Sequence, residues 1–167
     1  MIVEKEKQAL FQEVEQELKN NNFKIIKQDD ARPWGGFFVI DESQAKEFAG
    51  KYFEGIPVEE LKISGKLSPK FLLVAPGKRL SWQYHHRRAE IWKVLRGRVG
   101  IVTSATDEEG ELQELEPGTL ITLQQGERHR LVGLDEWSVL AEIWQHTDAA
   151  KPSDEEDIVR VQDDFGR

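Results

Sequence analysis

The feature that most constrains the fold is a succession of short, β-rich runs that begins near residue 70 and continues to residue 144. Glycine or proline separates nearly every pair of runs, which is typical of tight turns between antiparallel strands. Many short strands at this spacing predict an antiparallel barrel or sandwich, the class that contains the jelly rolls. An immunoglobulin-like sandwich is the alternative within this class. The expected strands are residues 71–74, 81–85, 90–95, 99–104, 120–123, 130–134 and 137–144.

The part of the chain before these runs has a different pattern. Residues 4–20 place apolar side chains at helical spacing among Glu, Gln and Lys, which predicts an amphipathic helix. A short strand is expected at residues 23–27 and a second helix at residues 43–53. We therefore expect a helix and strand extension over residues 1–30 and a mostly β barrel domain over residues 31–167.

Composition narrows the range of functions. The net charge of -8, from 31 acidic and 23 basic residues, argues against a general affinity for nucleic acid or for an anionic membrane. Any anionic ligand must therefore bind in a local basic pocket. The absence of cysteine excludes a thiolate metal site. The sequence lacks the pattern of a secretory signal and any apolar run long enough to cross a bilayer, so we expect a cytoplasmic protein without a membrane partner.

Polar side chains with metal-binding chemistry interrupt the predicted strands. In the run 81–85, Gln83 and His85 are two residues apart and therefore project from the same face. Glu90 opens the next run after a short basic turn, so a hairpin can return its carboxylate beside them. His129 follows a glycine turn at the start of a later run and supplies a fourth donor. This donor set predicts a site for a divalent ion, with zinc favoured and Mn, Co, Ni or Fe(II) also compatible.

The spacing of these donors resembles the two sequence signatures of the cupin superfamily. The glutamine, the first histidine and the glutamate lie between Gly77 and Gly97, as in the first signature. The second signature is matched from Gly118 to His129. Gln83 stands where most cupins have their first histidine. Cupins are jelly-roll barrels, so the resemblance implies a cupin jelly-roll β-barrel with the donors in its interior.

Three motifs are similar to the isomerase domain of type II phosphomannose isomerases. KRLSWQYHHRRAEIW at residues 78–92 resembles that family's KRLSLQ and RAEHW segments, in which the glutamine is a metal ligand. RPWG at residues 32–35 resembles the opening of the domain, and EDIVR and DFGR within residues 156–167 resemble its end. The similarity spans roughly residues 32–167. The chain has no room for the nucleotidyltransferase domain of the bifunctional members, so guanylyltransferase activity is not expected.

The resemblance implies an enzyme that interconverts mannose 6-phosphate and fructose 6-phosphate with a divalent ion. Arg160 matches the arginine of the family's DIVR motif, which the resemblance implies is needed for isomerase activity. Arg79 and Arg88 belong to the matched stretch and are expected to bind the phosphorylated sugar, although Arg88 could equally orient Glu90. Glu142 alternates with apolar residues, so it faces either the cavity, as an acid or base, or solvent. A homodimer is expected.

Further features leave other functions open. Ile91 replaces the histidine of the family's AEHW segment, and an extra segment of roughly residues 41–68 separates RPWG from the first barrel strand. These departures are compatible with an isomerase for another phosphosugar, such as a heptose phosphate. A non-catalytic, metal-binding cupin that binds sugar phosphates or nucleotide sugars is the competing class, because one fold hosts many functions. The acidic stretch at residues 151–157 is expected to be a solvated loop.

Overall fold

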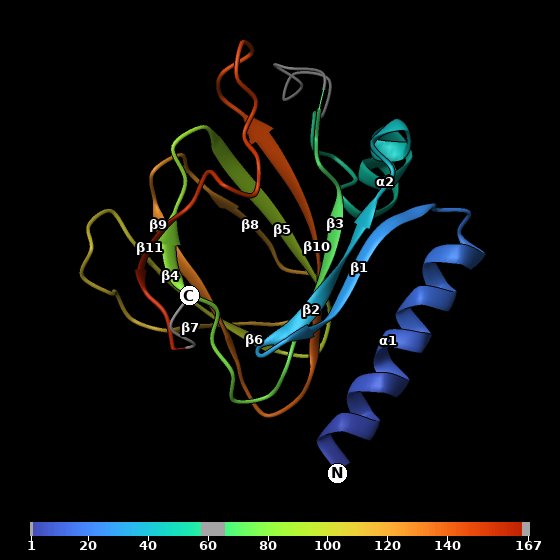
Figure 1. Ribbon diagram of the computed structural model, residues 1–167. Coiled ribbons are helices and arrows are strands. Elements are labelled where there is room, and N and C mark those ends of the chain that lie inside the picture. Colours follow the sequence, from blue (N-terminus) through green and yellow to red (C-terminus); the bar gives the residue numbers. More distant parts are fainter. Residues whose placement is uncertain (1, 58–65, 165–167) are drawn as a thin grey trace.

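The computed structural model describes residues 2–57 and 66–164 of the chain. Residues 58–65 of the extra segment and residues 165–167 of the DFGR motif lie outside the described residues. Two antiparallel sheets form the body of the protein, and helix α1 (Ile2–Asn20) lies outside them (Figure 1). None of the helices in the described ranges is long and apolar enough to cross a membrane.

The larger sheet has six strands in the order β1, β2, β3, β10, β5 and β8. The strand β10 lies near its centre and pairs antiparallel with both β3 and β5. Nearly every residue of β3 and β10 is buried, and most residues of both strands are apolar. The strands are β1 (Ile25–Arg32), β2 (Gly35–Ile40), β3 (Lys70–Val74), β5 (Arg88–Arg96), β8 (Leu120–Leu123) and β10 (Ser138–His146).

The smaller sheet has five strands in the order β11, β4, β9, β6 and β7. Its edge strand β11 comes from the C-terminal end of the described chain and pairs antiparallel with β4, on the left in Figure 1. The segment between β10 and β11 thus crosses from one sheet to the other. The strands are β4 (Trp82–Tyr84), β6 (Val99–Ser104), β7 (Gln113–Leu115), β9 (Arg128–Gly133) and β11 (Val159–Gln162).

Side chains of the larger sheet are divided between two hydrophobic cores. Phe71 and Leu73 of β3 pack with α1 and α2 on the outer face of the sheet. Leu72 and Val74 alternate with them and pack between the two sheets. The interior of the barrel therefore receives the side chains of one face of each sheet. The outer helical layer consists of α1, the 3-10 helix η1 (Glu42–Gln44) and α2 (Ala45–Tyr52).

The structure confirms the predicted mostly β cupin barrel with an N-terminal helix. The predicted strands 99–104 and 120–123 coincide with β6 and β8. The strand predicted at residues 23–27 instead begins at Ile25 and continues to Arg32. The proposed boundary between residues 30 and 31 therefore lies inside β1, which belongs to the larger sheet, and the division into two parts stays a prediction.

Candidate metal centre

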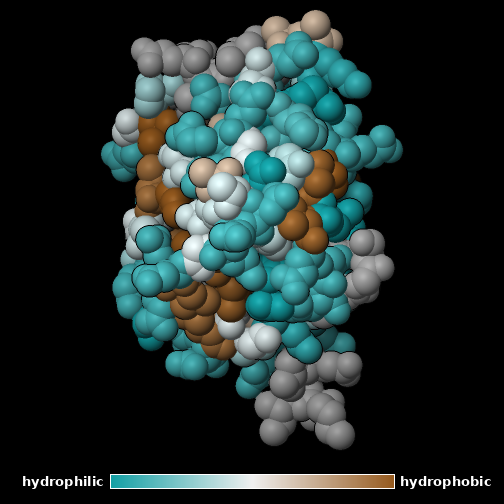
Figure 2. Space-filling view, turned by 90° about the vertical axis from the view of Figure 1, so that its left-hand side faces the viewer, coloured by the Kyte–Doolittle hydropathy of each residue, from teal (hydrophilic) through white to brown (hydrophobic). Residues whose placement is uncertain are grey.

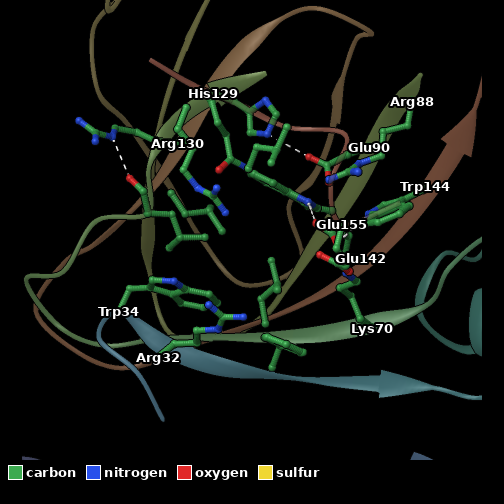
Figure 3. A pocket seen from close by; sticks show the side chains of 18 residues that line it. Arg32, Trp34, Lys70, Arg88, Glu90, His129, Arg130, Glu142, Trp144 and Glu155 are labelled. Carbon is green, nitrogen blue, oxygen red and sulfur yellow. Dashed lines mark hydrogen bonds and ion pairs between the residues drawn. The ribbon is translucent and has the colours of Figure 1, made fainter. Parts of the chain in front are cut away.

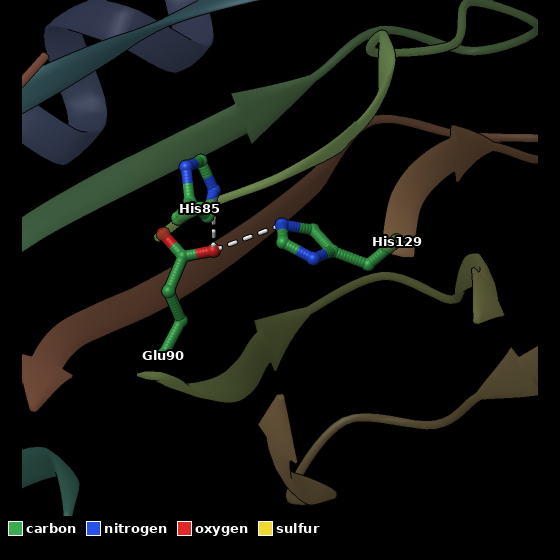
Figure 4. Close-up of side chains that lie close together, drawn as sticks. All are labelled: His85, Glu90 and His129. Carbon is green, nitrogen blue, oxygen red and sulfur yellow. Dashed lines mark ion pairs between the residues drawn. The ribbon is translucent and has the colours of Figure 1, made fainter. Parts of the chain in front are cut away.

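Three of the four predicted metal ligands meet in the interior of the barrel (Figure 4). His85 follows β4, Glu90 lies in β5 and His129 lies in β9. One donor atom from each residue lies within 4.8 Å of the others, and all three residues are buried. The Nε2 atom of His129 is 2.9 Å from Glu90 Oε1, and the Nε2 atom of His85 is 3.4 Å from the same oxygen. The two sheets thus bring distant parts of the sequence to one point.

Both imidazole rings are held with Nε2 towards the glutamate. Nδ1 of His85 lies 2.7 Å from the backbone oxygen of Asp157, and Nδ1 of His129 lies 3.0 Å from that of Glu127. A carbonyl oxygen only accepts hydrogen bonds, so each Nδ1 carries a proton, and in the neutral form of the ring Nε2 then presents a lone pair. Carbonyl groups commonly orient metal-binding histidines in this way. The chain therefore presents two imidazoles in the tautomer that a metal ion requires.

The electrostatics of the group also favour a cation. Glu90 Oε1 and His129 Nε2 are buried without a hydrogen-bond partner among the described residues, although they face each other. Burial lowers the pKa of His85, which keeps its imidazole neutral. Burial raises the pKa of Glu90, but attraction to His85 in its protonated form and to Arg88 outweighs burial and holds that pKa well below its usual range. A divalent ion can replace a proton that these groups share, because it binds to an ionised carboxylate and to unprotonated imidazole nitrogens.

Gln83, the fourth predicted ligand, lies beside the group, but its amide nitrogen faces His85 and its amide oxygen faces Ser81. Its Nε2 atom is 3.5 Å from Nε2 of His85, while its Oε1 atom accepts a hydrogen bond from the Ser81 hydroxyl. The amide oxygen and nitrogen exchange places by half a turn, and a hydroxyl can either donate or accept. Half a turn would direct the amide oxygen towards the group. The role of Gln83 as a ligand stays a prediction.

Arg88 links the metal group to the segment between β10 and β11. Its Nε atom donates to Glu90 Oε2 at 3.3 Å. Its Nη1 atom donates to the Ser153 hydroxyl and to the backbone oxygen of Asp154, both at 2.9 Å. Its Nη2 atom lies 3.3 Å from Nε2 of His85. Arg88 is thus placed to orient Glu90, one of its two predicted roles, while substrate binding by Arg88 stays a prediction.

Asp157 ties the same segment to the turn that bears the first histidine. Its carboxylate accepts hydrogen bonds from the backbone N–H groups of His86 and Arg87, both at 2.9 Å, and from the Ser153 hydroxyl at 2.6 Å. Burial raises the pKa of Asp157, but these hydrogen bonds outweigh it and lower the pKa to about 2. The backbone oxygen of Asp157 also holds the ring of His85. The C-terminal segment is therefore part of the site.

The metal group borders a cavity between the two sheets. Figure 3 shows Glu90 and His129 across this cavity from Arg32 and Trp34. Cationic side chains outnumber carboxylates in the lining, although the net charge of the whole chain is -8. Such a cavity suits a small anionic ligand. The cations are Arg32, Lys70, Arg88, Arg130 and Arg160, and the carboxylates are Glu90, Glu142 and Glu155.

Glu142 faces this cavity and not solvent, which decides between the two orientations that the sequence allowed. Its Oε2 atom accepts a hydrogen bond from Trp92 Nε1 at 2.5 Å, and its Oε1 atom accepts one from Trp144 Nε1 at 3.0 Å. Burial and the charge of Glu90 raise the pKa of Glu142 to about 7, against the opposing charge of Lys70. A carboxyl group with this pKa can both take and give a proton near neutral pH.

The two remaining predicted residues are placed differently. Arg160 lines the cavity and lies opposite Gln83 in the register of β11 and β4. Arg79 is not among the residues that line this cavity. Its Nε and Nη2 atoms donate to the two carboxylate oxygens of Asp164, at 2.8 and 2.6 Å. The structure thus brings Arg160 but not Arg79 to the cavity, and the substrate roles of both stay predictions.

Sequence reasoning missed Lys70, Glu155 and Asp157. Lys70 opens the buried strand KFLLV, and a cation on the inward face of such a strand is a signal that the sequence contains. The acidic stretch at residues 151–157 was expected to be a solvated loop, but Asp157 is buried in it and Glu155 lines the cavity. No local pattern distinguishes these two acids from their exposed neighbours.

Comparison of the sequence with models of protein families gives a match. The family model described as Mannose-6-phosphate isomerase C-terminal matches residues 58–163, which is more than half of the chain. A comparison with curated proteins gives no match.

Solved structures give a further comparison. The chain is similar to a Cupin 2 conserved barrel domain protein from Salinispora arenicola CNS-205, with 30% identity, a TM-score of 0.41 and coverage of 49% of this chain and 63% of that one. It also shares the fold of the capsular polysaccharide assembling protein CapF from Staphylococcus aureus, with 15% identity and a TM-score of 0.54. The match covers 81% of this chain and 34% of that one. It spans less than two thirds of either protein. The chain belongs to the mannose-6-phosphate isomerase C-terminal family.

Proposed function

We propose that this protein is a metal-dependent sugar-phosphate isomerase, with mannose 6-phosphate and fructose 6-phosphate as the favoured pair. The observation that carries the proposal is the buried group of His85, Glu90 and His129 beside a cavity rich in cations. The family match supports the same class of reaction. These three residues and Gln83 would hold a divalent ion, with zinc favoured among Zn, Mn, Co, Ni and Fe(II).

Proton transfer between two carbons is the step that the chain's own residues must perform. A bound divalent ion would supply Lewis acidity that polarises the oxygens on C1 and C2 of the sugar. Glu142 would take the proton from one carbon and return it to the other, because it lines the same cavity as Glu90 and His129 and burial raises its pKa in the metal-free protein. The indole N–H groups of Trp92 and Trp144 hold its carboxylate at the cavity wall.

The cationic lining would bind the phosphorylated sugar and stabilise negative charge that develops during the reaction. Arg160 reaches the cavity from β11, on the sheet that also carries His129. Its guanidinium can bind a phosphate through two parallel hydrogen bonds, and it matches the arginine of the DIVR motif. We therefore assign it to the substrate, as a contact for the phosphate or for the developing oxyanion. A homodimer and a cytoplasmic location remain part of the proposal.

The direct test is an isomerase assay of metal-reconstituted protein with mannose 6-phosphate, coupled to detection of fructose 6-phosphate. We expect metal-dependent turnover that is abolished in His85→Ala and reduced about 100-fold or more in Arg160→Ala. Arg98→Ala is the matched control, because Arg98 is exposed and pairs with Glu114 and Glu116. Its activity should equal that of the wild type.

A panel of hexose, heptose and pentose phosphates separates the proposal from its competitors. Turnover of a different phosphosugar would keep the reaction class and change the substrate. Metal-loaded protein that binds these sugars but isomerises none of them would contradict the enzymatic proposal and favour a binding role.

A further inference from the structure

One cation of the cavity lining is a buried lysine that contacts two carboxylates of the protein itself. Lys70 is the first residue of β3, is 6% exposed and lies on the same inward face as Leu72. Its Nζ atom is 3.8 Å from Glu142 Oε1 and 2.8 Å from Glu155 Oε1. It also lies 4.4 Å from the centre of the Trp144 ring. Figure 3 shows Lys70 below this ring with both carboxylates beside it.

The two carboxylates that contact Lys70 differ in their surroundings. Glu142 is buried and held by two indole N–H groups, so it is a fixed part of the wall. Glu155 belongs to the segment between β10 and β11, and its side chain is 70% exposed. An exposed side chain therefore reaches into the cavity and places an anionic group on a buried ammonium. The Glu155 carboxylate of the protein itself thus occupies the position beside Lys70 in the cavity.

We propose that Lys70 is an anion subsite of the cavity, that it takes a phosphate or carboxylate group of a small ligand, and that Glu155 occupies it until such a ligand binds. The guanidinium of Arg88 lies 3.6 Å from the centre of the Trp144 ring that Lys70 also contacts. Burial raises the pKa of Glu155, but the charges of Lys70 and Arg88 lower it, so a second cation acts on the anion that occupies the subsite. The subsite rests on these contacts, and the identification of its ligand as the phosphate of a sugar rests on the proposed function.

The surrounding contacts allow Glu155 to leave without disturbing the site. The residues on either side are anchored, because Arg88 holds Ser153 and the Asp154 backbone, and Asp157 is fixed to the turn after β4. Only the Glu155 side chain has to rotate, and its carboxylate is then hydrated. Because the exposed Glu155 carboxylate regains water when it leaves, an entering anion can take its place on Lys70. Lys70 keeps Glu142 as a neighbour throughout.

Matched substitutions of neighbouring acids test the subsite. Glu155→Gln and Glu156→Gln each remove one negative charge, but Glu156 is exposed and does not line the cavity. The affinity of metal-loaded protein for inorganic phosphate is measured by calorimetry at low ionic strength. We expect Glu155→Gln to lower the Kd about two- to fivefold, and Glu156→Gln to leave it unchanged. Equal shifts in both variants, or weaker binding by Glu155→Gln, would overturn the proposal.

The dependence on Lys70 is tested by adding Lys70→Met to the wild type and to Glu155→Gln. The increase in phosphate affinity that Glu155→Gln causes should disappear when Lys70 is absent. An increase that persists in the Lys70→Met background would overturn the subsite. If Lys70→Met does not fold, the comparison of Glu155→Gln with Glu156→Gln still decides. Phosphate binding needs no turnover. A protein that is inactive as an isomerase but binds phosphate more tightly after Glu155→Gln would therefore contradict only the proposed isomerase activity. An active protein with equal shifts contradicts only the subsite.

Discussion

Glu90 and Glu142 are buried carboxylates of one cavity, yet their pKa values move in opposite directions. Burial raises both, but at Glu90 it is outweighed by His85 and by the charge of Arg88. At Glu142 the charge of Glu90 adds to burial, and the pKa rises to about 7. Such a separation distinguishes a permanently ionised group from a proton carrier. Glu90 therefore suits a metal ligand and Glu142 an acid or base.

Substitution of the proposed proton carrier should reduce turnover without affecting metal binding. We expect Glu142→Gln to lower kcat for mannose 6-phosphate by about 10²- to 10⁴-fold, the usual contribution of general acid and base catalysis. Glutamine keeps one oxygen that can accept from Trp92, but its amide nitrogen leaves the Trp144 N–H without an acceptor, so circular dichroism is used to check the fold of the variant. The metal content of the purified variant is the control. Full activity in Glu142→Gln would contradict the assignment.

The raised pKa of Glu142 also predicts how stability depends on pH. The pKa is about 7 in the folded protein against an ordinary value of 4.5, so the folded state binds the proton more tightly. This contribution is fully present below pH 4.5 and is lost as the pH rises through about 7. Urea titrations of metal-free protein should show the wild type losing stability relative to Glu142→Gln from about pH 5 to about pH 8. A pH-independent difference would contradict this expectation.

At the scale of elements, the clearest feature is that the segment between β10 and β11 completes a site built on other strands. It supplies the backbone oxygen of Asp157 to the ring of His85, and it carries Glu155 to Lys70. It then continues into β11, which brings Arg160 to the cavity. The candidate metal ligands lie on or next to β4, β5 and β9, but the orientation of His85 depends on this later segment.

Loss of the Asp157 carboxylate should therefore weaken both the fold and the metal site. Asparagine has one acceptor oxygen in place of two, so Asp157→Asn leaves a backbone N–H of His86 or Arg87 without its partner. We expect the free energy of unfolding to fall by about 1–3 kcal/mol, and the metal affinity to fall about 10- to 100-fold. Glu156→Gln is the control. A folded Asp157→Asn protein with wild-type metal affinity would show that this contact does not support His85.

The RPWG hairpin gives a matched test of backbone geometry. Gly35 has a φ of +140°, and a Cβ there would lie 1.9 Å from the backbone oxygen of Leu73. Gly35→Ala should therefore destabilise the protein by more than about 1 kcal/mol. Gly50 lies within α2, and a Cβ at that position would have open space around it, so Gly50→Ala should stabilise by roughly 0.5–1 kcal/mol. Chemical denaturation measures both, and equal effects would contradict the close approach at Gly35.

The sequence predicted apolar strands between clear turn residues well and polar edge strands poorly. Residues 99–104 and 120–123 are bounded by turn residues, and their strands begin and end where predicted. The strand β7, residues 113–115, was missed because two of its three side chains are exposed and polar. The polar part of β1 was missed for the same reason. Strand pairing at an exposed edge depends on the neighbouring strand, which local periodicity does not reveal.

The candidate site was predictable where a spacing motif exists. The motif around residues 83–90 and the later His129 identified the metal group, because two-residue spacing places donors on one face of a strand. Lys70 and Asp157 act through contacts with residues more than 70 positions away in the sequence. Such contacts follow from the closure of the barrel and have no local signature.

At the scale of the whole molecule, the fold separates an acidic surface from a cationic interior. Figure 2 shows a largely hydrophilic face over the smaller sheet, with separate hydrophobic patches. The most exposed large hydrophobic side chains in the described ranges come from different elements. Each is exposed singly, which is usual on the surface of a protein. Three of these cations, Lys70, Arg88 and Arg130, are buried within the barrel. The architecture thus reconciles a net charge of -8 with a ligand that carries negative charge.

The central claim is that His85, Glu90 and His129 bind one divalent ion on which activity depends. The most direct test is calorimetric titration of chelator-treated wild type and Glu90→Gln with zinc and with manganese, followed by the isomerase assay at each point. We expect one equivalent per chain in the wild type, activity that rises in step with occupancy, and at least about 10-fold weaker binding in Glu90→Gln. Equal affinity in the two proteins, or activity that survives complete removal of metal, would contradict the account.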